Sequence, residues 1–318
     1  MTHALRPILA WLLLASPAIA QESQPLSAID WLSQSVAADV VAPLTPAIDE
    51  PPVADSATAP AVRVTPLDNA SPDPVGLLAS STTGLPHSLW SHSDEATLVT
   101  LVRAESLPTL PALQELMKVL MLAEADAPLG AGSEGALFLA RVDKLLDLGV
   151  LPQAQALLEL AEPETPELFR RWFDVALLTG SEHAACDVME SRPTVAPTYP
   201  ARIFCLARSG DWTAAALTLN THHVLGDVTE TEEALLSRFL DPDLYEGEAP
   251  LPPPTRISPL EFRMREAIGE GLTTAPLPLA FAHADLRDTT GWKAQLDVAE
   301  RLARNNALPA NILQGLYT

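Results

Sequence analysis

Apolar residues recur with helical spacing over most of the chain beyond residue 90. In the stretch 111–125, Leu113, Leu116, Met117 and Leu120 follow one another at the intervals that place side chains on one face of a helix. Capping residues and prolines mark helix starts, and glycines mark helix ends. Further helices are expected within residues 93–104, 133–148, 153–161, 199–219, 229–240, 258–268, 277–285, 292–304 and 309–317. The pattern predicts an all-α body.

A helix–glycine–helix pattern recurs in the middle of this body. Gly149, Gly180 and Gly210 are about 30 residues apart, and an alanine stands four or five residues after each of them. Glycine at the end of a helix supplies the positive φ that terminates it, and a small residue lets two helices approach closely. The spacing favours a helical hairpin array, a TPR-like α-solenoid. The alternative is a set of ordinary helical hairpins of similar length.

The N-terminal part of the chain has a different pattern. Residues 1–20 contain Arg6, an apolar run and small residues ending at Ala20, which is typical of a secretory signal peptide cleaved after Ala20. An uncleaved membrane anchor is the alternative, but the run is shorter than the roughly 20 residues that span a bilayer. We therefore expect export to the periplasm, with no membrane span after cleavage of the signal peptide.

Two further segments separate this signal from the body. Residues 21–38 form a short amphipathic segment, in which Ile29 and Leu32 share a helical face beside Trp31. These three residues are a candidate interaction site, either for the body of the same chain or for a partner; a weak nascent helix is the other interpretation. Residues 39–89 are rich in Pro and Ala and predict a disordered linker, which leaves residues 90–318 as the helical repeat-like domain.

Composition and charge agree with a helical, acidic protein. Of the 318 residues 47% are hydrophobic, only 14 are glycine, and aromatic residues make up 5%. Ala and Leu lose little conformational freedom on entering a helix, so this mixture favours helices over sheets. The net charge is −22, from 41 acidic and 19 basic residues. Such a surface repels phosphate backbones, so we exclude nucleic acid as a partner.

Cys186 and Cys205 are the only cysteines in the chain. Cys186 falls on the second helix of one expected hairpin and Cys205 on the first helix of the next. In an oxidising compartment two such cysteines are expected to form a disulfide, which would contribute roughly 3 kcal/mol to stability. A free buried pair is the second interpretation, and a redox-active site is the third.

The sequence contains none of the familiar catalytic, nucleotide-binding or metal-binding motifs, so no catalytic residue, metal site or cofactor is assigned. The basic-aromatic cluster Arg170, Arg171 and Trp172 is a second candidate interaction site, although a helix with a buried Trp is the more conservative interpretation. His222 and His223 are expected to be exposed, and His283 and Asp285 to form a polar pair on a helix surface. The acidic stretch 241–248 is expected to be a solvated loop rather than a Ca²⁺ site.

Several stretches resemble one known family. They include PLSAIDWLS at 25–33, EGALFLARVDKLL at 134–146, FRRWFDVALLTG at 169–180 and YPARIFCLARSGDW at 199–212, together with the region 277–304. The resemblance is to exported alphaproteobacterial proteins that often carry the label "antifreeze glycopeptide polyprotein". It implies no catalytic residues. The label describes composition, because antifreeze glycopeptides are tandem Ala-Ala-Thr repeats and this chain has no such array, so ice binding is not expected.

These observations lead to one functional expectation and one alternative. The signal peptide, the hairpin period and the missing catalytic motif favour a periplasmic scaffold that binds a protein partner in the cell envelope. The alternative is a peptidoglycan-related envelope enzyme, or the helical accessory domain of one, with Glu134 and Glu159 as residues to test. A third class, storage of a ligand or metal ion on the acidic surface, would be recognised by a Ca²⁺-dependent melting shift.

Overall fold

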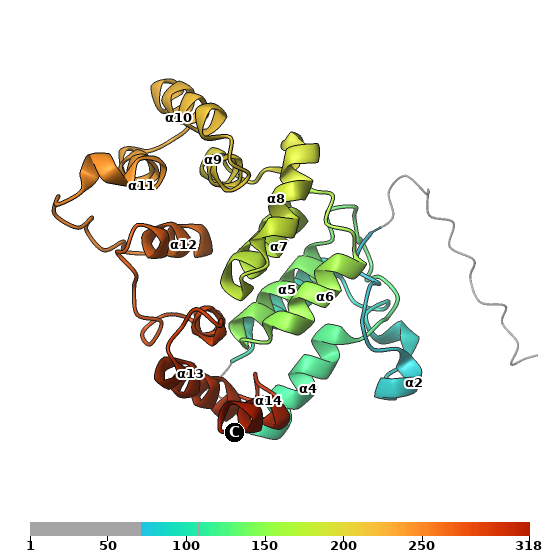
Figure 1. The fold of residues 1–318 in the computed structure, drawn as a ribbon. Helices are drawn as coiled ribbons and strands as arrows, with labels where there is room; N and C mark the ends of the chain where they lie inside the picture. The colour runs from blue at the N-terminus through green and yellow to red at the C-terminus, as the bar shows by residue number, and fades with distance from the viewer. Residues whose placement is uncertain (1–70, 107–108) are drawn as a thin grey trace, which may run out of the picture. The chain divides into compact units, whose positions relative to one another are not determined.

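The computed structural model describes residues 71–106 and 109–318, and these belong to one compact unit. Within this part of the chain the regular elements are helices, as expected, joined by turns and two isolated bridges. The signal peptide, the segment 21–38 and the linker as far as residue 70 lie outside the described residues. The helical class predicted from the sequence is therefore confirmed for the part that the structure describes (Figure 1).

The predicted helices are present, with bounds that differ by a few residues. Their starts are set by side-chain caps, because Asp94, Thr165, Thr198, Asp211 and Ser258 each accept a hydrogen bond from an N–H group of the first turn. The elements are α2 (Ser80–Thr83), η3 (His87–Leu89), α3 (Glu95–Ala104), α4 (Pro111–Leu122), α5 (Ala136–Asp147), α6 (Leu151–Leu160), α7 (Pro166–Thr179), α8 (Glu182–Ser191), η4 (Pro193–Val195), α9 (Tyr199–Arg208), α10 (Trp212–Leu225), α11 (Glu230–Leu240), η5 (Pro242–Tyr245), α12 (Pro259–Ala267), η6 (Leu279–Leu286), α13 (Trp292–Arg304) and α14 (Ala310–Leu316).

Residues 71–89 differ from the expected linker, because they fold against the body. Asp73 is completely buried, and its carboxylate accepts a hydrogen bond of 2.7 Å from the Phe138 N–H at the start of α5. Arg141 of α5 donates to the carbonyl oxygens of Asp73 and Val75 on one side and of Met121 and Ala123 on the other. This buried guanidinium explains why so polar a segment is ordered.

The three glycines of the repeat pattern have the predicted conformation. Gly149, Gly180 and Gly210 have φ angles of +73°, +82° and +90°, and they separate α5 from α6, α7 from α8 and α9 from α10. Each pair of helices packs side by side. The three hairpins are thus present.

The hairpins do not continue as an open array. In a solenoid each unit contacts only its neighbours, whereas here α12 and η6 return to pack against α7. The succession from α7 through α8, α9, α11 and α12 therefore closes on itself (Figure 1). The TPR-like arrangement is not established by this packing.

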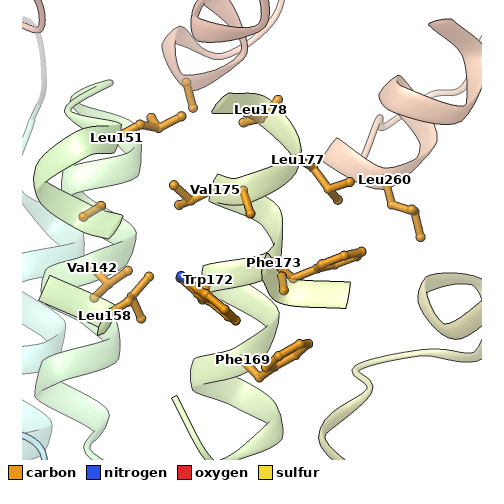
Figure 2. Close-up of a cluster of buried hydrophobic side chains, with 14 of the residues drawn as sticks. Val142, Leu151, Leu158, Phe169, Trp172, Phe173, Val175, Leu177, Leu178 and Leu260 are labelled. Carbon is orange, nitrogen blue, oxygen red and sulfur yellow. The ribbon is translucent and has the colours of Figure 1, made fainter. Parts of the chain in front are cut away.

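Helix α7 is the centre of the core. Its residues Phe169, Phe173 and Val175 are almost completely buried (Figure 2). Figure 2 shows Val142 and Leu158 of the preceding hairpin on one side of α7 and Leu260 of α12 on the other. Such burial from several directions is expected for a helix that contacts α6, α8, α12 and η6.

One local prediction is wrong in part and another is wrong. In α4 the side chains of Leu113 and Leu116 are about half exposed, at 51% and 49%, whereas Met121 and Leu122 are buried. Met117 and Leu120, the other two residues of the predicted face, are partly buried and pack against the core, so the second half of that face and the end of α4 meet the body. The element 279–286 is a 3₁₀ helix, and its His283 is buried, with Nε2 2.6 Å from the carbonyl oxygen of Gly149, instead of lying on a helix surface.

Candidate functional site

A cavity of about 330 Å³ lies where α7, α9, α11 and α12 meet. It is open to solvent, and its walls come from four helices that are separated in the sequence, with lining residues from Arg170 to Met264. The lining residues are Arg170, Phe173, Asp174, Pro197, Thr198, Pro200, Ala201, Thr231, Glu232, Leu235, Ser258, Leu260, Glu261 and Met264. The cavity exists because α12 returns to α7, so it belongs to the feature that distinguishes this fold from an open array.

The inner wall of the cavity is apolar. Phe173, Leu235, Leu260 and Met264 are all less than one tenth exposed and belong to the continuous core. Aromatic contacts hold the walls together, because the Phe173 ring lies 6.3 Å from that of Phe204 in α9. The Phe204 ring in turn stacks on that of Phe239 in α11 at 5.5 Å. The inner wall is therefore well packed and suited to an apolar group.

The polar lining comes from the first turns of three helices. Thr198, Glu232 and Ser258 stand at the starts of α9, α11 and α12. Their oxygens are already used, since Thr198 and Ser258 accept from first-turn N–H groups and Glu232 accepts from the Thr229 N–H at 2.9 Å. These caps neutralise part of the positive potential of the helix starts.

Asp174 is a lining carboxylate whose ion-pair partner lies at the limit of contact. It is a quarter exposed, and its carboxylate lies 4.0 Å from the Arg170 guanidinium, which also approaches Glu167 at 3.6 Å. Burial raises the pKa of Asp174 to about 6, against the opposing effect of Arg170 and Arg171 and with a further small increase from Asp143. By contrast, Glu261 is paired with Arg265 at 3.0 Å.

The lining has more negative than positive groups. Among the described residues that line the cavity, Arg170 is the basic one, and it stands against Asp174, Glu232 and Glu261. An apolar inner wall beside such carboxylates matches the amphipathic shape of a Lys or Arg side chain, whose stem is apolar and whose end is charged. The arrangement thus suits a basic side chain better than an anion.

A buried carboxylate fixes the helices around the cavity. Glu182, at the start of α8, is 3% exposed, and its Oε1 lies 3.4 Å from Arg208 of α9 and 3.1 Å from Arg263 of α12. The Cys186–Cys205 disulfide joins α8 to α9 with a Cα–Cα distance of 5.1 Å, as predicted. Together these links hold α8, α9 and α12 in one arrangement.

The predicted interaction residues differ in their exposure to solvent in the structure. Arg170 lines the cavity and its side chain is 46% exposed. Arg171 is buried and makes paired hydrogen bonds of 2.7 and 2.9 Å to Asp143. Trp172 is buried as well, with its Nε1 3.4 Å from Glu159. Of this cluster only Arg170 is accessible to a partner, and Ile29, Trp31 and Leu32 lie outside the described residues.

Other candidate residues have structural partners. His222 stacks on Tyr199 with ring centroids 3.4 Å apart, and its Nδ1 lies 2.9 Å from Asp227. Asp285 accepts a hydrogen bond from Thr274 at 2.5 Å rather than pairing with His283. In the part of the chain that the structure describes, no group of three or more His, Cys, Asp or Glu side chains is placed to hold a metal ion.

Sequence reasoning missed Asp174 and the convergence of three predicted helix starts around it. Asp174 lies two residues after Trp172 of the basic-aromatic cluster, but nothing in its local sequence pattern signals a cavity. The prolines and capping residues at 197–200 and 258–259 do signal helix starts. Their convergence depends on the return of α12, which has no local signature.

Comparisons of the chain with protein-family models, curated proteins and solved structures gave no match. Among residues 71–106 and 109–318, no helix combines the length and apolar character needed to cross a bilayer. The interpretation of the cavity therefore depends on its own residues.

Proposed function

We propose that this chain is an exported scaffold protein that binds a protein partner in the cell envelope, and that the cavity between α7, α9, α11 and α12 is its binding site. The observation that carries the proposal is the combination of an apolar inner wall with the poorly compensated carboxylate of Asp174. A basic side chain inserted from a partner would cover Leu260 and pair with Asp174.

The location forms part of the proposal. The signal peptide in residues 1–20 directs the chain to the periplasm, and the Cys186–Cys205 disulfide suits an oxidising compartment. The three hairpins follow one another like the units of a TPR-type array, and the return of α12 turns the inner surface into a cavity. The resemblance to exported alphaproteobacterial proteins is in line with this location.

Photo-crosslinking tests the binding site. A photoreactive amino acid in place of Thr231, which is exposed at the cavity, is expected to capture one envelope protein through a segment containing Lys or Arg. The same group in place of the exposed Asp297 on α13 is the matched control and should capture nothing specific. Asp174→Asn should reduce capture at position 231 by about tenfold, the loss of one charge-assisted pair.

Two outcomes would contradict the proposal. One is the absence of a specific product from position 231. The other is turnover of an envelope substrate by the purified protein without any partner.

One observation favours an enzyme as the second candidate function. A carboxyl group with a pKa of about 6 in a cavity is suited to general acid catalysis, as in peptidoglycan cleavage. Glu159 is less suitable than expected, because it is bonded to Trp172 and Gln155. Release of muropeptides by the purified protein, and its loss in Asp174→Asn, would establish this alternative.

A further inference from the structure

Residues 191–210 form a basic stretch in an otherwise acidic protein. They contain three arginines and no acidic residue, although the whole chain has a net charge of −22. Two of these arginines are paired with acidic residues of other segments, since Arg192 lies 2.8 Å from Glu164 and Arg208 lies 3.4 Å from Glu182. Such pairing is what a strongly acidic surface is expected to impose on its few basic residues.

Arg202, the third arginine of the stretch, is half-buried at the end of the first turn of α9. Among residues 71–106 and 109–318, every other arginine that is buried or half-buried donates a hydrogen bond to a carboxylate or a main-chain carbonyl oxygen. The guanidinium of Arg202 reaches no acceptor in the same part of the chain. Because a half-buried charge loses part of its hydration, Arg202 has donors available for an acidic group from outside the chain.

Arg202 lines two hollows that adjoin the cavity of the proposed function. The middle hollow, of about 470 Å³, shares Pro197 and Thr198 with that cavity. The small hollow, of about 70 Å³, shares Pro193 and Arg202 with the middle one. Since each hollow has lining residues in common with the next, the three form one groove around the start of α9, here termed the α9 groove.

The lining of the α9 groove changes in character along its length. The cavity at one end has an apolar inner wall and the carboxylate of Asp174. The middle hollow is bordered by prolines and threonines of the loop before α9 and by the guanidinium of Arg202. The small hollow at the other end lies against the Cys186–Cys205 disulfide and Met189, so it suits a small apolar side chain. A negative and a positive group thus stand at separate points of one groove.

The acidic residues that line the middle and small hollows leave Arg202 unpaired. Asp227, in the middle hollow, is held by His222, whose Nδ1 lies 2.9 Å from the Asp227 carboxylate. Glu190, in the small hollow, is exposed, and no ion pair joins it to Arg202 in the part of the chain that the structure describes. The planar fork of a guanidinium matches the two oxygens of a carboxylate, so the group that Arg202 suits best is an Asp or Glu side chain.

We propose that the partner binds through an extended segment that presents an Asp or Glu side chain to Arg202 as well as a Lys or Arg side chain to Asp174. This inference rests on the proposed function, because the same segment occupies the cavity. The acidic group is a side chain rather than the end of a chain, since the α9 groove continues past Arg202 to the disulfide. Opposite charges at two points also fix the direction of the segment, because a reversed segment would bring like charges together.

Photo-crosslinking of the whole protein from a second position tests this inference. A photoreactive amino acid in place of Thr194, which is exposed at the middle hollow, should capture the same envelope protein as one in place of Thr231. Mass spectrometry should place both attachment points in one segment, with an Asp or Glu nearer to the Thr194 product. Arg202→Glu should lower capture at both positions at least tenfold, and Arg202→Lys should lower it less than threefold. Arg103→Glu, at an exposed position of α3, is the matched control and should leave capture unchanged.

The failure of this inference is distinguishable from the failure of the proposed function. Replacing the captured acidic residue of the partner by Lys should restore capture by the Arg202→Glu variant, which a folding defect would not allow. Absence of capture at both positions would overturn the proposed function and this inference with it. Capture from Thr231 that is indifferent to Arg202→Glu, that maps to a segment without an acidic residue, or that the partner's Lys does not restore would overturn this inference alone.

Discussion

Arg141 is the residue on which the order of the N-terminal part of the body depends. It is completely buried, and burial lowers the pKa of its guanidinium to about 10. Its hydrogen bonds go to main-chain carbonyl oxygens of two segments that are far apart in the sequence, residues 73–75 and 121–123. The planar fork of an arginine can serve both segments at once, which a lysine cannot do.

Replacing this side chain should release the first segment. Arg141→Met keeps the volume but leaves three buried carbonyl groups and the part-buried one of Val75 without this donor, so we expect a loss of at least about 3 kcal/mol in the free energy of unfolding. Urea unfolding followed by circular dichroism measures this loss, and limited proteolysis should show early cleavage near residue 75. Arg103→Met, at an exposed position of α3, is the control and should change stability by less than about 0.5 kcal/mol. Equal stability of the two variants would contradict this account.

The role of Arg141 was not accessible from its local sequence. The pattern of 133–148 predicts a helix, and α5 covers most of that range. An arginine in such a pattern is normally assigned to the solvent side. Only the position of residues 71–78, whose composition indicates a linker, provides the carbonyl groups that allow this charge to be buried.

At the scale of elements, the glycines of the three hairpins have the same backbone but different surroundings. A Cβ atom at Gly149 would lie 2.7 Å from Leu279 of η6, whereas a Cβ atom at Gly210 would meet no atom within 4 Å. The recurrence of glycine therefore has a common conformational cause. At Gly149 the close approach of η6 is a second reason for glycine, because Leu279 leaves no room for a Cβ atom.

This difference predicts two magnitudes of destabilisation. Gly210→Ala should cost about 1 kcal/mol, the price of a left-handed conformation for a residue with a Cβ atom. Gly149→Ala should cost roughly 1–3 kcal/mol more, because the added methyl group displaces Leu279. Denaturant midpoints of the two variants measure the difference. Equal midpoints would show that η6 adapts without cost.

The sequence predicted helices and their ends better than it predicted their packing. Caps, prolines and glycines are local signals, and the two ends of α13 fall where the pattern placed them. Only Met117 and Leu120 of the predicted face of α4 pack against the core, because periodicity identifies an apolar stripe but not the element that covers it. Likewise, His283 is buried because its partner, the Gly149 carbonyl group, comes from a distant hairpin.

At the scale of the whole molecule, the return of α12 to α7 creates the cavity, and Asp174 in its wall has a raised pKa. Sequence periodicity suggested an open helical array and assigned no role to Asp174. In the closed arrangement, residues of α11 and α12 line the same cavity as Asp174, whose burial raises its pKa. The raised pKa of Asp174 thus reports on the closure, which no local pattern could reveal.

Asp174 should make stability depend on pH. Its pKa is 3.8 in ordinary surroundings and about 6 in the folded protein, so the folded state holds the proton more tightly than the unfolded state does. The contribution of this group to stability is complete below pH 4 and is lost as pH rises through 6. Asp174→Asn carries no such titration. Relative to the unaltered protein, its free energy of unfolding should therefore increase by about 1–3 kcal/mol between pH 4 and pH 8.

Urea unfolding at several pH values provides the measurement, and a variant of an exposed carboxylate provides the control. Asp297→Asn on α13 removes the same charge from an open surface, so its stability should follow that of the unaltered protein at every pH. If the free energy of unfolding of Asp174→Asn also follows that of the unaltered protein at every pH, the Asp174 carboxyl group titrates as it would in water, and the four helices do not bury it. A divergence that begins near pH 4 and is complete above pH 6 requires the closed arrangement, because an open array would leave Asp174 solvated.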